Sequence, residues 1–293
     1  MAIHVVPTDF LTVQDAINFA SPGDSIQLLD GTFDGFVVPN NKPRLKIFGE
    51  GIGESIIAGA PLGSFGIIVL ADRTSIQGLT VQGFALGGVQ INSDSNILKD
   101  IESVLNMGIN TEGFELNGQN NLCIRCTSRQ NDFGMTINSG EHNFIYQCIM
   151  QNNEFGFFSV SNNNKLISSE IKENNSFGII LLAFTTLFGS SSLRNGAIGI
   201  FVIFNNNTII ENIVWDNDTG IQLFFFGENV IDSNIVRKND INGGIFVSAI
   251  TMDNVIRFNK LKLNEPFDLI SANINNIFDG NRCESSNPPG LCI

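Results

Sequence analysis

Polar and charged side chains that recur every 21 or 22 residues are the first candidates for chemistry in this chain of 293 residues. They form the column Arg129, Gln151, Glu173, Arg194, Asp216, Lys238 and Lys260. If each repeat stacks about 4.8 Å from the next, Glu173 and Asp216 lie roughly 10 Å apart between backbones, with Arg194 between them. Two carboxyl groups at about this separation can serve an inverting glycosidase. Glu173, Arg194 and Asp216 are therefore candidate catalytic residues, an acid and base pair around a cation.

The same column also has a structural interpretation. Its charges alternate in sign from Glu173 through Arg194 and Asp216 to Lys238. Such a ladder pairs opposite charges on neighbouring strands and prevents like charges from stacking. We favour the ladder over the catalytic hypothesis for these residues.

Acidic turn residues are the candidates for a calcium site. They precede a recurring glycine in several repeats and are Asp132, Glu154, Asp218 and Asp240. Stacked carboxylates can hold Ca²⁺, but Ser176 and Gly196 interrupt the run. We therefore expect solvated turn residues, with Ca²⁺ possible but not favoured, and no other cofactor.

Cysteine and histidine supply the residue types of a zinc site. Cys123, Cys126, His142 and Cys148 lie within one stretch of the sequence. Cys126 and Cys148 are one repeat apart, so they can stack inside the coil, whereas a zinc site needs side chains that converge. We expect no metal here. The other histidine, His4, lies far away in the sequence, so a Ser-His-Asp triad is not expected either.

The C-terminus holds a second cysteine pattern. The chain has five cysteines, so at least one thiol is unpaired within it. Cys283 and Cys292 enclose a polar, Pro-rich loop. We predict a disulfide between them that pins this end of the chain, with two free thiols as the alternative.

A repeat of 21 to 25 residues dominates the sequence. Its marker glycines are Gly66, Gly88, Gly113, Gly134, Gly156, Gly178, Gly199, Gly220 and Gly244. After each glycine the residues alternate with period two, which is typical of strands. The Leu-x-x-Leu-x-Leu pattern of leucine-rich repeats is missing. The sequence therefore predicts an all-β coil of short strands, each turn stacked on the last, with about ten coils.

Asparagine columns accompany the glycines. One comprises Asn121, Asn143, Asn164, Asn207, Asn229, Asn254 and Asn276, and another Gln130, Asn152, Asn174, Asn195, Asn217 and Asn239. Stacked amides can bond both the turn backbone and the next amide, and Asn tolerates the left-handed backbone of tight turns. We interpret both columns as structural.

The N-terminal segment predicts a cap. Residues 12–20 have the pattern of a short helix, with Thr12 as N-cap and Asp15 at the third helical position. A helix across the first coil would cover the sticky end of a β-stack. We expect one domain with three parts: an N-terminal strand and capping helix over 1–24, coils over 25–264, and a last coil with a C-terminal cap over 265–293.

The segment FLTVQDAINFASPGDSIQLLDGTF (10–33) resembles the opening of right-handed parallel β-helix proteins of the pectate-lyase-like superfamily. The Asn-rich repeats from 88 to 280 are similar to the generic repeats of these proteins. The resemblance covers nearly the whole chain and implies a right-handed parallel β-helix formed by one chain. It implies no single activity, because that superfamily includes lyases, hydrolases, epimerases, phage tailspikes and non-catalytic surface proteins.

One outer face of the predicted coils changes character along the chain. If the residue after each glycine points inward, the next points outward. The outward positions are polar in earlier coils, as at Glu115 and Thr136, but apolar in later ones. The apolar positions are Phe158, Val160, Ile180, Leu182, Phe201, Ile203, Phe224 and Phe246. A stripe of this size is unusual on a soluble monomer, so we expect a homo-oligomer, and the resemblance makes a homotrimer the first choice.

Composition limits the possible partners. The formal charge of −13, from 16 basic and 29 acidic residues, argues against a nucleic acid. No apolar run has the roughly 18 residues of a membrane span. The first residues show neither the basic nor the apolar part of a signal peptide, although the expected place is extracellular or on a cell, spore or virion surface.

Three functions follow from these observations. The first is a structural, surface-assembly protein that forms a homo-oligomer through the apolar face, without catalysis. The second is a polysaccharide lyase or glycoside hydrolase with Glu173, Arg194 and Asp216 as its site. The third is a glycan-binding module that uses exposed Phe, although the single Trp and single Tyr count against it.

Overall fold

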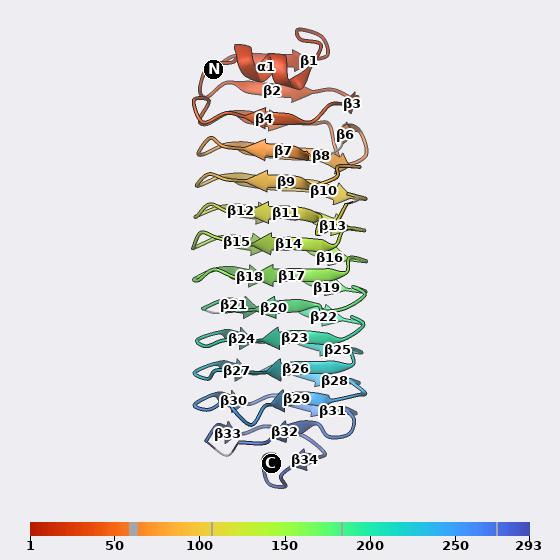
Figure 1. Cartoon of the computed structure of the whole chain (residues 1–293), viewed down its shortest axis with the longest axis vertical. Coiled ribbons are helices and arrows are strands. Elements are labelled where there is room, and N and C mark those ends of the chain that lie inside the picture. The colour runs from red at the N-terminus through yellow and green to blue at the C-terminus, as the bar shows by residue number, and fades with distance from the viewer. Residues whose placement is uncertain (59–63, 107, 183, 274) are drawn as a thin grey trace. The chain divides into compact units, whose positions relative to one another are not determined.

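The computed structural model describes residues 1–58, 64–106, 108–182, 184–273 and 275–293. These residues form two compact units, Met1–Ile149 and Met150–Ile293, which are considered separately below. In each unit the chain winds as a parallel β-solenoid, with three strands to a full coil (Figure 1). Equivalent strands of successive coils pair in parallel and form three lanes, here called lanes 1, 2 and 3 in chain order.

The first unit contains strands of all three lanes. Lane 1 holds β1 (Ile3–Val6), β2 (Ser25–Leu28), β5 (Lys46–Phe48), β12 (Leu122–Ile124), β15 (Phe144–Tyr146) and the first halves of β8 (Ser75–Gln82) and β10 (Ile97–Val104). Lane 2 holds β3 (Gly31–Phe33), β6 (Ser55–Ala58), β13 (Thr127–Arg129) and the second halves of β8 and β10. Lane 3 holds β4 (Phe36–Val38), β7 (Phe65–Val69), β9 (Gly87–Ile91), β11 (Glu112–Leu116) and β14 (Phe133–Ile137).

The second unit repeats this arrangement. Lane 1 holds β18 (Lys165–Ile167), β21 (Thr186–Phe188), β24 (Thr208–Ile210), β27 (Val230–Asp232), β30 (Val255–Arg257) and β33 (Ile277–Asp279). Lane 2 holds β19 (Glu170–Lys172), β22 (Ser191–Leu193), β25 (Ile213–Trp215), β28 (Ile235–Arg237) and β31 (Lys260–Lys262), and β16 (Ile149–Gln151) contains the unit boundary. Lane 3 holds β17 (Phe155–Ser159), β20 (Ile179–Leu181), β23 (Ile198–Val202), β26 (Thr219–Leu223), β29 (Gly243–Val247), β32 (Leu269–Ser271) and β34 (Ser286–Asn287).

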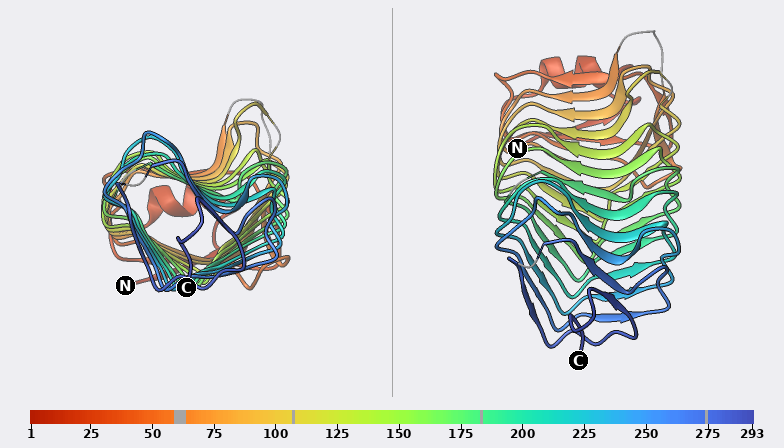
Figure 2. Two further views of the ribbon diagram at one scale, coloured as in Figure 1. Left: turned by 90° about the horizontal axis from the view of Figure 1, so that it is seen from below. Right: turned by 60° about the horizontal axis from the view of Figure 1, so that its bottom comes forward.

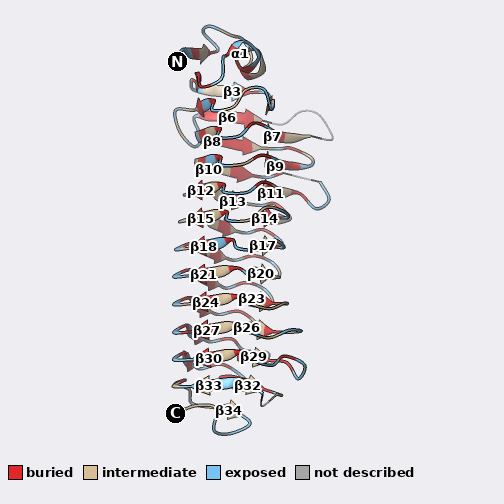
Figure 3. Ribbon diagram, turned by 90° about the vertical axis from the view of Figure 1, so that its left-hand side faces the viewer, coloured by how far each residue is buried: buried red, intermediate tan, exposed pale blue. Residues whose placement is uncertain are grey.

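The predicted all-β parallel coil is confirmed. In the described residues lane 3 has twelve strands, one for each coil, against about ten predicted. Strands form where apolar and other residues alternate, because one side of each strand faces the interior of the coil. In β20, Ile179 and Leu181 are buried while Ile180 between them is only half-buried (Figure 3). The interior is therefore a column of Ile, Val, Leu and Phe.

Many corners between lanes combine a left-handed residue with a buried polar residue after it. At one such corner Arg194 has a φ of 50°, and Asn195 follows it into the interior. The backbone N–H and side-chain amide of Asn195 both donate to the Oδ1 of Asn217 in the next coil, at 2.9 and 3.0 Å. Asn174 donates to Asn195 in the same way. The predicted ladder of stacked amides is thus confirmed.

Two members of the predicted ladder were assigned wrongly. Gln130 and Asn152 are exposed residues with positive φ, and the residues after them, Asn131 and Asn153, are the buried ones. The amide of the ladder points inward only at the position directly after the left-handed residue. The prediction therefore placed the ladder one residue too early in these two coils. A third ladder, at the corner between lanes 1 and 2, was missed and consists of Asn212, Asn234, Asn259 and Asn281.

The N-terminal cap has the predicted form. Helix α1 (Val13–Phe19) begins after Thr12, whose Oγ1 accepts the backbone N–H of Asp15 at 3.0 Å. The helix buries Val13, Ala16 and Ile17 against the first coil of its unit (Figure 2). Among the described residues, no helix is long and apolar enough to span a membrane.

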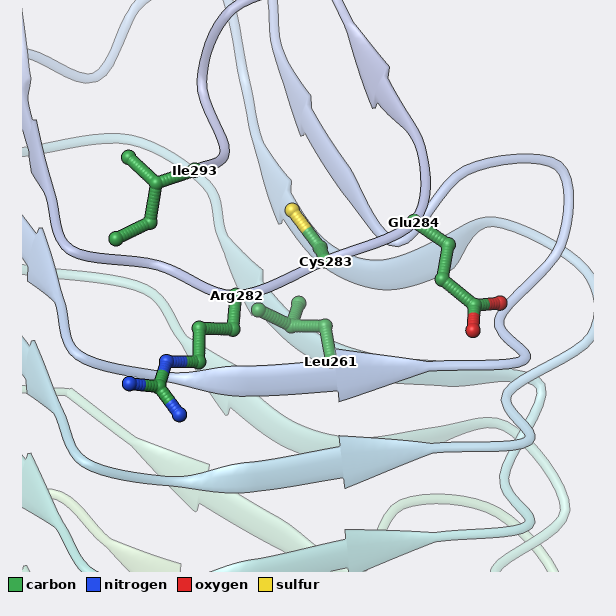
Figure 4. A pocket seen from close by; sticks show the side chains of 5 residues that line it. All are labelled: Leu261, Arg282, Cys283, Glu284 and Ile293. Atoms are coloured by element: carbon green, nitrogen blue, oxygen red, sulfur yellow. The ribbon is translucent and has the colours of Figure 1, made fainter.

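The C-terminal segment closes the last coil of the second unit. Cys283 and Cys292 are joined by a disulfide with Cα atoms 5.5 Å apart. Beside it lies a hollow of about 390 Å³, lined by Leu261, Arg282, Cys283, Glu284 and Ile293 (Figure 4). Strand β34 pairs with β32 and so covers its open edge.

Candidate functional site

The predicted catalytic column lies at the corner between lanes 2 and 3 of the second unit. Glu173, Arg194 and Asp216 all have positive φ, and each backbone N–H donates to a carbonyl of the next coil. They therefore stack in register, and Lys238 continues the column. The outer members of the sequence alignment do not belong to it, because Arg129, Gln151 and Lys260 lie in strands β13, β16 and β31. The one-residue shift that affected the asparagine ladder accounts for Arg129 and Gln151.

The contacts of this column are those of a charge ladder. Arg194 donates from Nε and Nη2 to Oε1 of Glu173, at 3.1 and 2.5 Å. The guanidinium of Arg194 and the ammonium of Lys238 lie 5.6 and 5.7 Å from the ring centre of Trp215. Glu173, Arg194, Asp216 and Lys238 are all exposed. The acid and base role of Glu173 and Asp216 stays an untested prediction.

The metal hypotheses gain no geometric support. No group of three or more His, Cys, Asp or Glu among the described residues is arranged to hold a metal ion. His142 is exposed, whereas Cys123, Cys126 and Cys148 are buried inside the coil. Burial raises the pKa of the Cys123 and Cys126 thiols, so they are inert core side chains.

The acidic turn residues are likewise scattered. In the second unit, Asp218 has a raised pKa because of burial and the nearby charge of Asp240. Glu154 accepts a hydrogen bond from the Asn175 amide at 3.3 Å. In the first unit, Asp132 accepts the backbone N–H of Thr111 at 3.1 Å. Hydrogen bonds within the chain thus account for two of these carboxylates.

The predicted apolar stripe lies on the outer face of lane 3 in the second unit. Its side chains point outward but are mostly half-buried, because they pack on one another: Phe158, Val160, Ile180, Leu182, Phe201, Ile203, Phe224 and Phe246. Further rings extend it, since Phe155 stacks on Phe177 at 5.9 Å and Phe177 on Phe201 at 5.5 Å. The stripe is therefore a packed apolar surface of aromatic and aliphatic side chains, in which Gln222 interrupts the column between Phe201 and Phe246.

The first unit carries a different outer face on its lane 3, and this face holds a carboxylate pair that the sequence analysis did not select. Glu115 points outward from β11, and Gln90 of β9 and Thr136 of β14 are its register partners. Glu112 also points outward, because Gly113 turns inward between them. A Cβ at Gly113 would lie 2.1 Å from the Ser128 hydroxyl, so only glycine fits there.

Three amide side chains hold Glu115. Gln90 donates to Oε2 at 2.7 Å, and Asn117 and Asn138 donate to Oε1 at 3.1 and 2.9 Å. Asn92 links the first two by bonding both Gln90 and Asn117. The carboxylate is thus fixed in a lattice of neutral amides on three successive strands.

Glu112 has an unusual acidity. Its carboxyl is half-buried, and burial is the main cause that raises its pKa to about 7. The negative charge of Glu115 adds to the effect, and that of Asp132 contributes less. A carboxyl group with a pKa near neutrality can donate a proton at one step and accept it at another. Glu112 is therefore the strongest acid and base candidate in the first unit.

A buried hydroxyl completes the face. Among the described residues, Thr136 Oγ1 is one of two buried side-chain N or O atoms without a hydrogen-bond partner. A buried hydroxyl without a partner costs free energy, so such groups are rare in folded proteins. Thr136 adjoins Glu115 in register, so this unused hydrogen-bonding group lies directly beneath the face.

The same face continues into a hollow of about 440 Å³ nearer the N-terminal cap. Phe65 and Ile68 of β7 line it together with Phe84, and α1 contributes Gln14. Phe65 and Ile68 occupy the same columns as Glu112 and Glu115, because both pairs register with β9. Aromatic and aliphatic walls next to polar groups are typical of sites that bind small organic ligands.

The sequence did contain a signal for Glu112. The residue before the marker glycine is Phe133, Phe155 or Phe177 in later repeats, and Glu112 stands at the equivalent place. The other residues at this place include Phe65, Gly87, Ile198, Thr219 and Gly243, so Glu112 is a carboxylate in a column of uncharged residues. The outward positions predicted from the sequence all follow the marker glycines, whereas Glu112 precedes one.

Comparison with solved structures shows the fold alone. No protein-family model and no curated protein sequence matches the chain. The A-module of the mannuronan C-5 epimerase AlgE6 from Azotobacter vinelandii has a similar structure, with a TM-score of 0.72 and 14% identity over 93% of this chain and 91% of that one. The Dettilon tailspike protein matches with a TM-score of 0.76 and 12% identity over 97% and 67%, and pectate lyase Pel9A with 0.53 and 13% over 98% and 78%. The chain therefore has the right-handed parallel β-helix fold that its sequence predicted.

Proposed function

We propose that this protein acts on a polysaccharide, with Glu112 as the acid and base group on the lane 3 face of the first unit. The observation that carries the proposal is the half-buried carboxyl group of Glu112 on the same face as a second carboxylate, Glu115, that amides hold in place. Burial raises the pKa of Glu112 to about 7, which supports the acid and base role. The epimerase and the pectate lyase that share the fold are named for reactions on polysaccharides, and their titles agree with this substrate class. They do not identify the reaction of this chain.

The spacing of the two carboxyl groups is compatible with hydrolysis. Glu112 and Glu115 are three residues apart on β11, so their Cα atoms lie at most about 10 Å apart. Inverting glycosidases separate their two carboxyl groups by roughly 6.5–9.5 Å, which leaves room for a water. In this mechanism protonated Glu112 gives its proton to the glycosidic oxygen, and the Glu115 carboxylate takes a proton from the attacking water.

The charges of the site favour a neutral glycan. The residues that make up this face are Glu112, Glu115, Asp132, Gln90, Asn92, Asn117, Thr136 and Asn138. They include no cation, and the whole chain has a charge of −13. A uronate would meet only like charge there, whereas the hydroxyls of a neutral sugar can pair with amides and with Thr136. Glycan binding without hydrolysis is the alternative outcome for this face.

The test is release of reducing sugar from a panel of neutral and acidic polysaccharides. We expect hydrolysis of a neutral polysaccharide, and we expect Glu112→Gln to lower its rate about 10²–10⁴-fold. Glu173→Gln and Asp216→Asn are matched controls in the second unit, and they should keep the full rate. Full activity of Glu112→Gln would overturn this site, and binding without any release would leave a glycan-binding module. Activity lost in the controls would instead favour the column of Glu173, Arg194 and Asp216.

We further propose that the apolar stripe of the second unit joins copies of this chain into a homo-oligomer, with a cyclic homotrimer as the first choice. The rings of Phe155, Phe177 and Phe201 stack in sequence, and the outward Ile180 registers with Phe201, so these side chains form an apolar surface. Surfaces of this kind on soluble proteins mark interaction sites. Closed rotational symmetry would bury the stripe without open-ended growth. An assembly of this type suits an extracellular or virion-surface protein, and a tailspike is among the proteins that share the fold.

Light scattering over a range of concentrations tests the oligomer. We expect a mass three times the chain mass of 31.9 kDa. The double variant Ile180→Ser and Phe201→Ser should dissociate it, while Phe258→Ser, an exposed ring outside the stripe, should not. A monomeric parent protein would overturn this second proposal and leave the polysaccharide site untouched.

A further inference from the structure

A second hollow in the first unit has the opposite charge to the rest of the chain. It measures about 450 Å³ and is lined by Met1, Pro22, Gly23, Arg44, Lys46, Arg73, Ser75 and Ile97. Three of these residues are cations, although the chain has only 16 Lys and Arg against 29 Asp and Glu. The hollow lies on lane 1 and its corner with lane 3, away from the lane 3 face that holds Glu112.

Arg44 and Arg73 occupy equivalent corner positions of consecutive coils. Both have positive φ, 64° and 60°, and each donates its backbone N–H to a carbonyl of the next coil at 3.0 Å. Two like charges therefore stack one strand spacing apart, about 5 Å between backbones. Lys46 adds a third positive charge on β5, where it registers with Ser75.

This arrangement contrasts with the charge ladder of the second unit. There the signs alternate, and Arg194 pairs with Glu173 in the neighbouring coil. At Arg44 and Arg73 no opposite charge intervenes, so the stack is electrostatically unfavourable by itself. A bound anion would remove this cost.

The nearby carboxylates are engaged by other groups. Asp72 accepts the backbone N–H of Asp94 at 2.9 Å, and Asp94 accepts two hydrogen bonds from Gln119. Asp24 accepts the backbone N–H groups of Ala2 and Ser21 and a contact from His4. Within the part of the first unit that the structure describes, Arg44, Lys46 and Arg73 form no ion pair. The three cations are thus free to meet a ligand.

We propose that this hollow binds a small phosphate monoester whose organic part has an apolar face. A ligand with two negative charges suits three cations better than a ligand with a single carboxylate does. The two nitrogens of a guanidinium group can also bind two phosphate oxygens at once. The hollow is larger than one inorganic ion needs, and Pro22 and the partly exposed Ile97 give it apolar walls. The site is independent of the polysaccharide site, since it uses none of its residues.

Calorimetric titration with four probes tests the ligand class. The probes are glucose 6-phosphate, glucose, glucuronate and inorganic phosphate, at a pH of about 7.5 where the phosphate monoester is a dianion. We expect glucose 6-phosphate to bind at least about tenfold more tightly than each of the other three. Equal affinity for glucuronate would refute the dianion, equal affinity for inorganic phosphate would refute the organic part, and absence of binding would refute the site.

Charge-matched variants test the residues. The double variant Arg44→Gln and Arg73→Gln should weaken binding at least about tenfold. Glutamine fits these corners, because Gln130 and Gln147 occupy corners with φ of 58° and 54°. The control, Arg237→Gln with Lys260→Gln, removes the same charge from the second unit and should bind as the parent does.

Lys46→Gln leaves both corners intact and provides a second, independent variant. It should also weaken the binding of glucose 6-phosphate. Unchanged affinity in both the double variant and Lys46→Gln would overturn the proposal. A loss of affinity in the charge-matched control would do so as well, because it would show a general effect of net charge.

Discussion

Glu112 and Glu115 lie three residues apart on strand β11 of the first unit, and the charge of Glu115 helps to keep Glu112 protonated near neutral pH. The inward turn at Gly113 places both carboxyl groups on the same outer face. Burial raises the pKa of Glu112 most, and Glu115 is the next cause. The amides of Gln90, Asn117 and Asn138 hold the second carboxylate in its place.

Removal of the Glu115 charge should therefore lower the pKa of Glu112. In Glu115→Gln we expect that pKa to fall below about 7 but to stay above the ordinary value of 4.5, because burial remains. Carbon-13 NMR titration of the Glu112 carboxyl measures it directly. Glu211→Gln, an exposed turn carboxylate of the second unit, is the control and should leave the titration unchanged. A Glu112 pKa that is the same in Glu115→Gln would contradict this coupling.

The raised pKa of Glu112 also predicts a pH dependence of stability. Between pH 4.5 and about 7 the folded chain keeps a proton on Glu112 that the unfolded chain releases. The free energy of unfolding therefore falls as the pH rises through this range, and Glu112 contributes no further change above it. Because the side chain is only half-buried, solvent screening reduces the loss to about 1 kcal/mol.

Denaturant unfolding of the parent protein and of Glu112→Gln at several pH values isolates this effect. The variant should become more stable than the parent as the pH rises from 4.5 to 7, since it has no carboxyl to ionise. Asp24 does not interfere, because hydrogen bonds from Ala2 and Ser21 are the main cause that lowers its pKa to about 2, and its effect lies below pH 4. A stability difference that does not change with pH would argue against a raised Glu112 pKa.

Most of the fold could be predicted because the same sequence pattern recurs in successive coils. The marker glycines fix the period, and alternation such as Ile179, Ile180 and Leu181 fixes which side faces inward. One-residue shifts at the corners were harder to see. Gln130 and Asn152 have the polarity of ladder residues, but the neighbouring Asn131 and Asn153 make the buried positions.

The carboxylate pair could not be predicted in the same way. Charge periodicity selected Glu173 and Asp216, which are exposed members of a ladder. The chemistry of Glu112 depends on its partial burial and on the neighbouring charge of Glu115, and neither property repeats along the chain. A site of this type is a local departure from the repeat, so it is most visible as a residue that breaks a column.

Removal of one side-chain amide from the asparagine ladder should lower the free energy of unfolding considerably. Asn195 donates two hydrogen bonds to Asn217 and accepts two from Asn174, all of them buried. Asn195→Ala leaves these partners unsatisfied, so it should lower the free energy of unfolding by about 2–4 kcal/mol. Asn175→Ala, an exposed neighbour with one long hydrogen bond to Glu154, should cost less than about 0.5 kcal/mol. Equal costs for the two variants, measured by chemical denaturation, would show that the ladder does not stabilise the coil.

The ion pair between Arg194 and Glu173 should contribute little to the free energy of unfolding. Both side chains are exposed to solvent, so water screens the attraction between their charges. Arg194→Gln should lower the free energy of unfolding by less than about 1 kcal/mol, with the contact to Trp215 contributing part of it. Unfolding experiments at low and high salt measure this, because the difference between parent and variant should shrink in salt. A loss of several kcal/mol would mean that the pair is buried in the folded protein.

A substitution at Thr136 should change the stability of the protein and its affinity for a sugar in opposite directions. Its hydroxyl is buried without a hydrogen-bond partner, so Thr136→Val should stabilise the free protein by about 1 kcal/mol. If the hydroxyl serves a sugar, the same variant should bind a neutral oligosaccharide more weakly, by a comparable free energy. Thermal unfolding and calorimetric titration of the same preparation give both values.

The control is Ser159→Ala, which removes a hydroxyl that is already hydrogen-bonded inside the second unit. This variant should lose stability and keep its affinity for the sugar. Higher stability of Thr136→Val with unchanged affinity would assign the unpaired hydroxyl to packing alone and remove it from the glycan site.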